Sequence, residues 1–238
     1  MFLLQGVLGL AVLHGAIPYN PVKAVRKPRQ VSRTVRPLAP QTVEAIRRQL
    51  SVRDATLVSV LAYAGLRPGE ALALRWSSVR KRTLLIEGSI SYGREKTTKT
   101  NATRSVRLLA PLAQDLAEWR LACGRPGEDA WIFARPDGEP WHNDDYRNWR
   151  KRGFVPAAKE AGLKEPRPYD LRHSFVSLLI HEKRLSIVEI ADQMGHAPTM
   201  TSDTYGHVMR ELRGAEPVSA EEQIRRARAR VFGERIGS

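Results

Sequence analysis

Three short segments between residues 64 and 208 constrain this chain more than any other feature of its sequence. Segment 64–70 contains Arg67, and segment 169–173 contains Arg172. Segment 194–208 places a tyrosine shortly after a Gly-His pair. Enzymes that handle phosphate use arginine because its planar fork matches the phosphate oxygens. Each segment alone is a weak signal, but their combined order and spacing are improbable by chance.

Together the segments resemble the tyrosine recombinases, or phage-type integrases, of prophages and mobile elements. The resemblance implies that Tyr205 attacks a DNA phosphodiester and forms a 3′-phosphotyrosyl bond. The implied phosphate clamp consists of Arg67, Arg172 and His196. A 5′ hydroxyl of another strand then reverses the step, which gives strand exchange. Because bond energy is conserved, the resemblance implies neither a metal nor ATP nor any other cofactor.

Local sequence signals orient the first arginine. Gly65 allows a break after an apolar helix, and Pro68 is suited to start the next one. Arg67 is therefore expected at the N-terminal turn of a helix, with Glu70 in support just behind it. Backbone N–H groups and the helix dipole favour an anion at this place. The alternative is a surface arginine that merely pairs with Glu70.

A lysine is expected on a hairpin between the two arginine segments. Integrases carry a catalytic lysine there in a Lys-Thr phrase before a basic strand, and Lys99 matches best, with Lys96 as the rival. Such a lysine would protonate the departing 5′ oxygen, since an alkoxide is a poor leaving group. Without the resemblance, a solvated lysine on a polar turn would be the simpler interpretation.

The second arginine segment departs from the family at its first position. Relatives usually have histidine where this chain has Tyr169, which puts the usual accessory acid or base in doubt. Three readings are open, in this order: the Tyr169 hydroxyl bonds the phosphate or the nucleophile, the ring packs as a spacer, or the site is weakened. A tyrosine is a poor proton acceptor at neutral pH but can donate a hydrogen bond. His173 is expected to support the site structurally.

The fold class expected is α+β and mainly helical, a helical catalytic domain of the DNA breaking-rejoining type. Apolar periodicity predicts helices, and segments 83–88, 89–92 and 103–109 predict a small three-stranded antiparallel sheet. Serine at position 186 and glycine at position 195 bound a helix that aims His196 into the site.

Four parts are expected along the chain. Residues 1–21 resemble the end of a core-binding helical domain, because an apolar helix is followed by a Pro-Tyr-Asn-Pro phrase. Residues 22–38 form a basic linker, residues 39–214 the catalytic domain, and residues 215–238 a helical tail. Relatives often dock such a tail on a neighbouring protomer, so self-association on DNA is expected through it.

Composition indicates the partner and the compartment. The 39 Lys and Arg against 25 Asp and Glu leave a net charge of +14, which favours double-stranded DNA. Cys123 is the single cysteine, so no intrachain disulfide can form and a cytoplasmic location fits. The apolar N-terminus lacks a preceding basic residue and includes polar residues, which favours a buried helix over a membrane segment or signal peptide.

Two other functions are compatible with these residues. The related type IB topoisomerases use the same chemistry to relax DNA with one active site. A truncated, non-catalytic DNA-binding remnant is the other alternative, because most of the core-binding domain is missing and Tyr169 is unusual. Covalent trapping separates an enzyme from a binding module.

Overall fold

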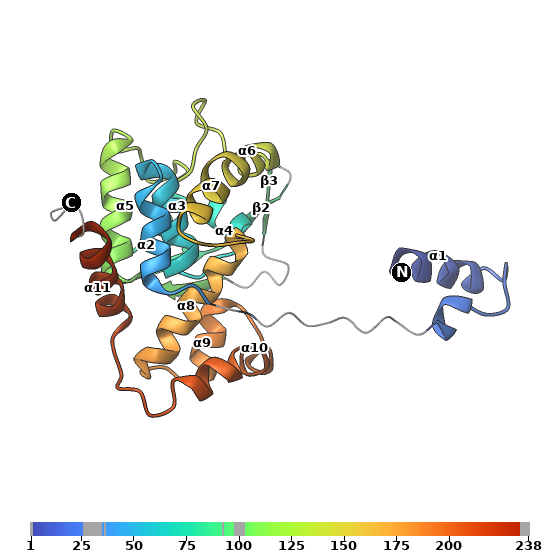
Figure 1. Ribbon diagram of the computed structural model, residues 1–238. Coiled ribbons are helices and arrows are strands. Elements are labelled where there is room, and N and C mark those ends of the chain that lie inside the picture. Colours follow the sequence, from blue (N-terminus) through green and yellow to red (C-terminus); the bar gives the residue numbers. More distant parts are fainter. Residues whose placement is uncertain (1, 26–34, 36, 92, 98–102, 234–238) are drawn as a thin grey trace. The chain divides into compact units, whose positions relative to one another are not determined.

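The computed structural model describes residues 2–25, 35, 37–91, 93–97 and 103–233. These residues form two compact units: residues 2–25 belong to unit 1, and unit 2 begins at Val35 (Figure 1). The predicted basic linker falls partly on residues 26–34 and 36, which lie outside the described residues.

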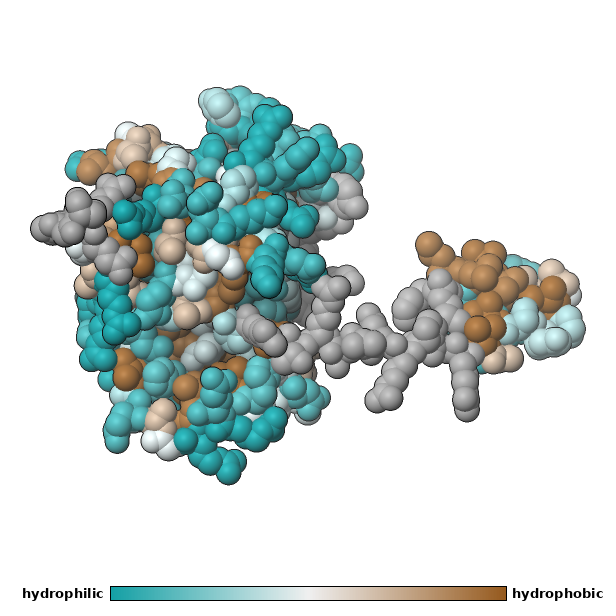
Figure 2. Space-filling view, viewed as in Figure 1, coloured by the Kyte–Doolittle hydropathy of each residue, from teal (hydrophilic) through white to brown (hydrophobic). Residues whose placement is uncertain are grey.

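Unit 1 contains α1 (Phe2–Leu13) and a short 3₁₀ helix, η1 (Pro21–Ala24). Asn20 ties them together: its Nδ2 donates to the carbonyl of Gln5 at 3.0 Å, and its Oδ1 accepts from the N–H of Val22 at 3.1 Å. Hydrophobic residues gather over this unit in Figure 2. Among the described residues, no helix is both long and apolar enough to span a bilayer.

Unit 2 is mainly helical, as predicted, and is built around α3 (Val52–Tyr63). This helix is buried from Thr56 to Tyr63 and packs against α2, α5 and α8. The remaining helices of unit 2 are α2 (Pro40–Arg48), α4 (Pro68–Leu72), η2 (Trp76–Ser78), α5 (Ala110–Ala122), α6 (Asn143–Trp149), η3 (Arg150–Phe154), α7 (Val155–Glu160), α8 (Pro168–Glu182), α9 (Ile187–Met194), α10 (Pro198–Glu211) and α11 (Ala220–Gly233). Helices α8, α9 and α10 gather at one end of the unit (Figure 1).

The strands differ from the single three-stranded sheet predicted. β1 (Thr83–Ile86) pairs with β4 (Arg104–Arg107), and β2 (Gly88–Ser91) pairs with β3 (Arg94–Thr97), both antiparallel. The chain leaves β1 at Glu87, and β2 then packs against α4 instead of extending the β1 ladder. A Cβ on Gly69 of α4 would lie 2.7 Å from the carbonyl oxygen of Ile90, so only glycine allows this approach.

Residues of the predicted C-terminal tail belong to unit 2. Helix α11 packs on α2, α5 and α8 of its own chain, and Ala220, Ile224 and Ala227 are buried in that contact. In Figure 1, α11 lies beside α2 and α5. Of the apolar residues of α11, Ile224 is buried within its own chain, whereas Phe232 is 47% exposed.

Candidate active site

Arg172 forms the centre of the site. It lies in the second turn of α8, its residue is only 1% exposed, and its guanidinium donates to the carbonyls of Gly65 and Met194. It also donates to Nε2 of His196 at 2.9 Å. Burial lowers the pKa of Arg172 to about 10, so the group stays charged at neutral pH. One side chain thus joins the ends of α3 and α9 to the start of α8.

Two glycines let the backbone reach the arginines of the site. Gly65 has φ of 63°, and a Cβ there would lie 2.7 Å from the Phe175 ring. Gly195 ends α9 in the left-handed conformation, with φ of 60°, and its carbonyl accepts from Nη2 of Arg67 at 3.1 Å. Glycine adopts this conformation without the steric cost other residues incur. The predicted helix end at Gly195 is confirmed.

Glu70 connects the arginines of the site. Its carboxylate accepts from Arg67 at 2.7 Å, takes two hydrogen bonds from Arg104, at 3.0 and 2.7 Å, and lies 3.8 Å from Arg172. Burial acts to raise the pKa of Glu70, but the hydrogen bonds and charge of Arg104 and the hydrogen bonds of Arg67 outweigh it and lower the pKa to about 2. We call these four side chains the Glu70 cluster.

The Glu70 cluster carries more positive charge than its one carboxylate neutralises. Arg67 keeps 40% of its side chain exposed at the N-terminus of α4, as predicted from the Gly-Pro spacing. Nε of Arg172 is buried without a hydrogen-bond partner among the described residues. Buried donors without partners are costly, so the cluster is suited to receive an anion.

His196 lies in the loop after α9 and completes the predicted clamp. Because an arginine only donates, Nε2 of His196 must accept from Arg172, and the ring is neutral with its proton on Nδ1. Nδ1 is buried without a partner among the described residues. Burial and then the charge of Arg172 lower the pKa of His196 to about 4. A neutral Nδ1–H is a donor available for a phosphate oxygen.

Tyr205 lies on α10 and faces α8. It is fully buried, and its hydroxyl lies 2.6 Å from Nδ1 of His173. Burial raises the pKa of Tyr205 above its ordinary value, although the charge of Arg172 opposes the shift. The structure therefore places the predicted nucleophile within the electrostatic reach of the clamp. Its direct contact, however, is with His173, to which the sequence assigned only a supporting role.

Two predicted catalytic residues remain, Tyr169 and Lys99. Tyr169 is 45% exposed, and its ring packs edge-on against that of His173, with centroids 5.4 Å apart. This packing matches the second reading, the spacer, whereas a bond from Tyr169 to a DNA phosphate stays a prediction. Lys99 lies outside the described residues, and its rival Lys96 is in β3, paired with Ser89.

Arg104 is the site residue that sequence reasoning missed. It lies on β4, and besides its two bonds to Glu70 its Nε donates to the carbonyl of Gln193 at 2.9 Å. Arg104 thereby links β4, the C-terminal end of α9 and the carboxylate of Glu70. The only signal in the sequence is a basic residue at the start of a strand, which does not identify a buried partner.

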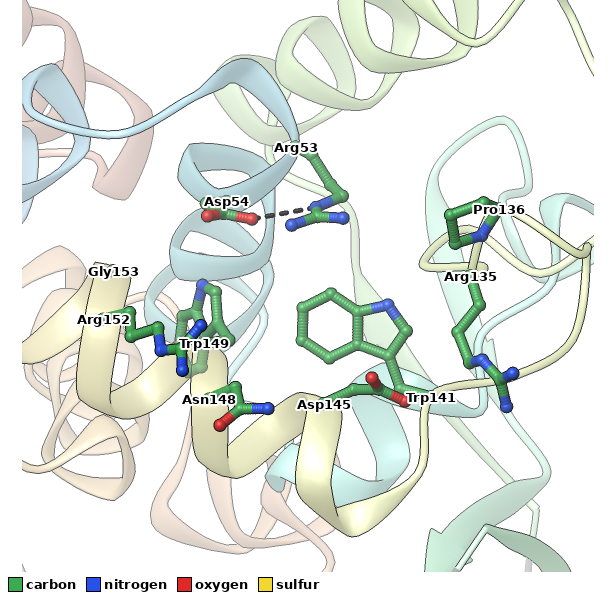
Figure 3. A pocket seen from close by; sticks show the side chains of 10 residues that line it. All are labelled: Arg53, Asp54, Arg135, Pro136, Trp141, Asp145, Asn148, Trp149, Arg152 and Gly153. Atoms are coloured by element: carbon green, nitrogen blue, oxygen red, sulfur yellow. Dashed lines mark hydrogen bonds and ion pairs between the residues drawn. The ribbon is translucent and has the colours of Figure 1, made fainter.

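No group of three or more His, Cys, Asp or Glu side chains is placed to hold a metal ion in the described part of the chain. A cavity of about 360 Å³ lies elsewhere, where α3 begins beside α6 and η3 (Figure 3). There, Arg53 lies 5.1 Å from the Trp141 ring and pairs with Asp54 at 2.9 Å. Since α3 separates Arg53 from Gly65 by roughly 18 Å of helix, this cavity is separate from the arginine site.

The sequence around this site is shared with known proteins. The profile of the phage integrase family matches residues 38–211. The ICEBs1 integrase of Bacillus subtilis (strain 168) is 31% identical over 64% of this chain and 44% of its own length. Tyrosine recombinase XerC of Methylobacterium sp. (strain 4-46) is 30% identical over 82% of this chain and 61% of its own length. The chain thus spans about half of these two relatives.

Solved structures share the fold. The Tn1549 transposon integrase in complex with a circular intermediate DNA aligns with a TM-score of 0.68 and 18% identity, over 84% of this chain and 71% of that one. A lambda integrase dimer bound to a COC' core site aligns with a TM-score of 0.64 and 21% identity, over 83% and 70%. At this identity the likeness establishes the fold.

Proposed function

This chain belongs to the phage integrase family, and from that premise we propose that it is a site-specific DNA recombinase that cleaves through Tyr205. Its partner would be double-stranded DNA and its place of action the cytoplasm. The observation that carries the proposal is the convergence of Arg67, Arg172 and His196, from three separate elements, with Tyr205 buried beside them. A site built only for stability would not need the unsatisfied donors of Arg172 and His196.

The chemistry follows from the needs of a phosphodiester, whose barrier lies in positioning and in charge on the nonbridging oxygens. The positive Glu70 cluster and Nδ1–H of His196 would hold those oxygens. Oη of Tyr205 would form the bond to phosphorus while the bond to the 5′ oxygen breaks. Lys99 would protonate that oxygen, and attack by a 5′ hydroxyl from another strand would release the tyrosine.

Glu70 and Arg104 would act by positioning. Two hydrogen bonds from Arg104 fix the carboxylate, which in turn fixes the exposed guanidinium of Arg67. Because the pKa of Glu70 is about 2, the carboxylate stays ionised throughout the neutral range. The clamp is therefore assembled before DNA arrives, which lowers the reorganisation needed in the transition state.

Self-association on DNA is the second part of the proposal. Relatives include a lambda integrase dimer bound to a core site and a lambda integrase tetramer bound to a Holliday junction. Helix α11 would dock on a neighbour by leaving the surface that it occupies in its own chain. Cross-linking on full-site DNA that yields only monomers would count against this part.

Covalent capture tests the function and requires no known target site. The chain is mixed with a pool of nicked duplexes of random sequence, and adducts that resist denaturant are isolated and sequenced. We expect the wild-type chain to enrich a defined sequence and Tyr205→Phe to form no adduct while still binding DNA. Binding without any wild-type adduct would indicate the non-catalytic remnant, and plasmid relaxation without strand exchange would indicate the topoisomerase-like activity.

A further inference from the structure

The contact between His173 and Tyr205 is not explained by the phosphate clamp. His173 follows Arg172 on α8, and its Nδ1 lies 2.6 Å from the Tyr205 hydroxyl, which α10 supplies. His173 is 9% exposed and Tyr205 is fully buried, so water does not compete for this hydrogen bond. A short contact between a ring nitrogen and the reacting oxygen identifies a group that can affect the proton of the nucleophile.

The protonation of His173 follows from its surroundings. Burial, and then the positive charge of Arg172, lower the pKa of His173 to about 4, so the ring is neutral at neutral pH. The other groups around it are Tyr169 on α8, His196 after α9 and Tyr205 on α10. A neutral imidazole has one donor and one acceptor nitrogen.

The direction of the hydrogen bond follows from the needs of the phenol. Among the described residues, Nδ1 of His173 is the one hydrogen-bond partner found for the Tyr205 hydroxyl. If Nδ1 carried the proton, the buried phenolic O–H would have no acceptor, which costs about 1–3 kcal/mol. With the proton on Nε2 instead, Nδ1 accepts and the phenol donates. The second arrangement is therefore the stable one.

Tyr169 cannot replace His173 in this role. A phenol has no basic ring nitrogen to accept a proton, and the Tyr169 side chain is 45% exposed. Its ring instead packs against the His173 ring at an interplanar angle of 75°. This edge-on contact limits rotation of the imidazole and keeps Nδ1 directed at Tyr205.

We propose that His173 is a further catalytic residue, whose Nδ1 accepts the phenolic proton of Tyr205 as Oη attacks the phosphate. The proposal rests on the recombinase function proposed above. In the forward step the Oη–phosphorus bond forms, the bond from phosphorus to the 5′ oxygen breaks, and the phenolic proton moves to His173. In the reverse step a 5′ hydroxyl attacks, and His173 returns the proton to the departing phenolate.

The test measures single-turnover adduct formation on the duplex that the wild-type chain selects by covalent capture. His173→Asn keeps an acceptor near the position of Nδ1 but cannot take a proton, and His173→Ala removes both. We expect each variant to form adduct roughly 100-fold more slowly than wild type. The wild-type rate should also fall as the pH approaches 4, and this fall should be smaller in His173→Asn, where only His196 still titrates in that range.

A duplex with sulfur in place of the 5′ bridging oxygen separates the two proton transfers. A thiolate leaves without protonation, so this duplex should restore a Lys99→Ala variant but leave both His173 variants slow. Full restoration of the His173 variants would place His173 on the leaving-group side and overturn the proposal. A faster adduct in His173→Ala would also overturn it, because His173 would then merely hold Tyr205 away from DNA.

A measurement without DNA keeps the proposal testable if a variant folds poorly. Nitrogen NMR of wild type at neutral pH should show His173 protonated on Nε2, with an Nδ1 shift that changes in Tyr205→Phe. A proton on Nδ1 would overturn the proposal. If the wild-type chain captures no duplex, the recombinase function itself fails; if it does and His173→Asn reacts at the wild-type rate, only the role of His173 fails.

Discussion

The Glu70 cluster and a second buried cluster in unit 2 differ in their balance of charge. The second, which we call the Glu44 cluster, joins α2, α5 and α11 and consists of Glu44, Arg47, Asp115 and Arg228. Two carboxylates there meet two guanidiniums, whereas in the Glu70 cluster one carboxylate meets three. Both clusters contain buried ion pairs, but the Glu70 cluster alone of the two has surplus positive charge, which suits the phosphate binding proposed for it.

Hydrogen bonding shows the same difference. In the Glu44 cluster, Arg228 contacts both carboxylates, Asp115 at 2.7 Å and Glu44 at 3.2 Å, and Tyr63 donates to Glu44 at 2.6 Å. Within the described residues, no buried polar atom in the side chains of this cluster lacks a hydrogen-bond partner. The Glu70 cluster, in contrast, leaves Nε of Arg172 without a partner. The hydrogen bonds of the Glu44 cluster are therefore complete, whereas the Glu70 cluster keeps one donor unpaired among the described residues.

The largest effect should come from Arg67→Ala. We expect adduct formation to slow by roughly 10²–10³-fold, because one donor to the charged transition state is lost, with little change in the free energy of unfolding. Single-turnover cleavage and urea unfolding would measure the two quantities. Arg53→Ala is a matched control, since that side chain is also 40% exposed and ion-paired. Equal slowing in both variants would remove the distinction between the Glu70 cluster and ordinary surface charge.

Arg228→Ala should have the opposite pair of effects, a loss of stability with little change in catalysis. We expect a loss of about 3 kcal/mol in the free energy of unfolding, near the lower end for a broken buried pair, because Arg47 still partners both carboxylates. The rate of adduct formation per folded molecule should change little. Denaturant unfolding measures the first expectation, and active-site titration the second. A catalytic loss at full stability would mean that the Glu44 cluster also serves the site.

Much of the site could be predicted because its signals are local. Gly65 and Pro68 bracket Arg67, and the helix end at Gly195 directs His196, so short stretches of sequence specify these positions. Pro111 likewise lies at the start of α5. Helix boundaries follow from the prolines and glycines at them, which act within a few residues.

Contacts between distant elements could not be predicted in the same way. Arg104 meets Glu70 across 34 positions, and His173 meets Tyr205 across 32, so both contacts depend on how helices and strands pack. The split of the strands into two pairs depends on β2 packing against α4. Hydrophobic periodicity indicates which face of an element is buried, but not which partner it meets.

Acid should weaken the folded state through the histidines of the site. The unfolded chain protonates them near 6.5, but the folded chain holds the pKa of His173 and His196 at about 4. Their contribution is therefore complete above pH 6.5 and is lost as the pH falls toward 4. We expect a loss on the order of 3 kcal/mol from His173 and a smaller loss from His196, which solvent screening reduces.

Urea unfolding at several pH values between 7 and 4 measures this loss. His196→Asn should flatten the dependence in part, since one of the two groups no longer titrates. A curve with the same slope in the variant would mean that the proton uptake comes from groups outside the site. The neighbours that lower the pKa of His196 are Arg172, Arg67, His173 and Arg104, so the site's positive charge contributes to this acid sensitivity.

The smallest effect should come from Arg226→Ala. Arg226 lies on α11 like Arg228 but outside the Glu44 cluster, so it serves as a comparison. Arg226 pairs with Glu222 at 2.7 Å, a closer contact than the 3.2 Å between Arg228 and Glu44, but its side chain is 62% exposed. Solvent screens an exposed pair, so its removal should leave the melting temperature unchanged, whereas Arg228→Ala lowers it. Equal losses in the two variants would show that α11 is held by its overall charge. A lower melting temperature in Arg228→Ala alone would show that the stabilisation comes from the buried carboxylates that Arg228 contacts.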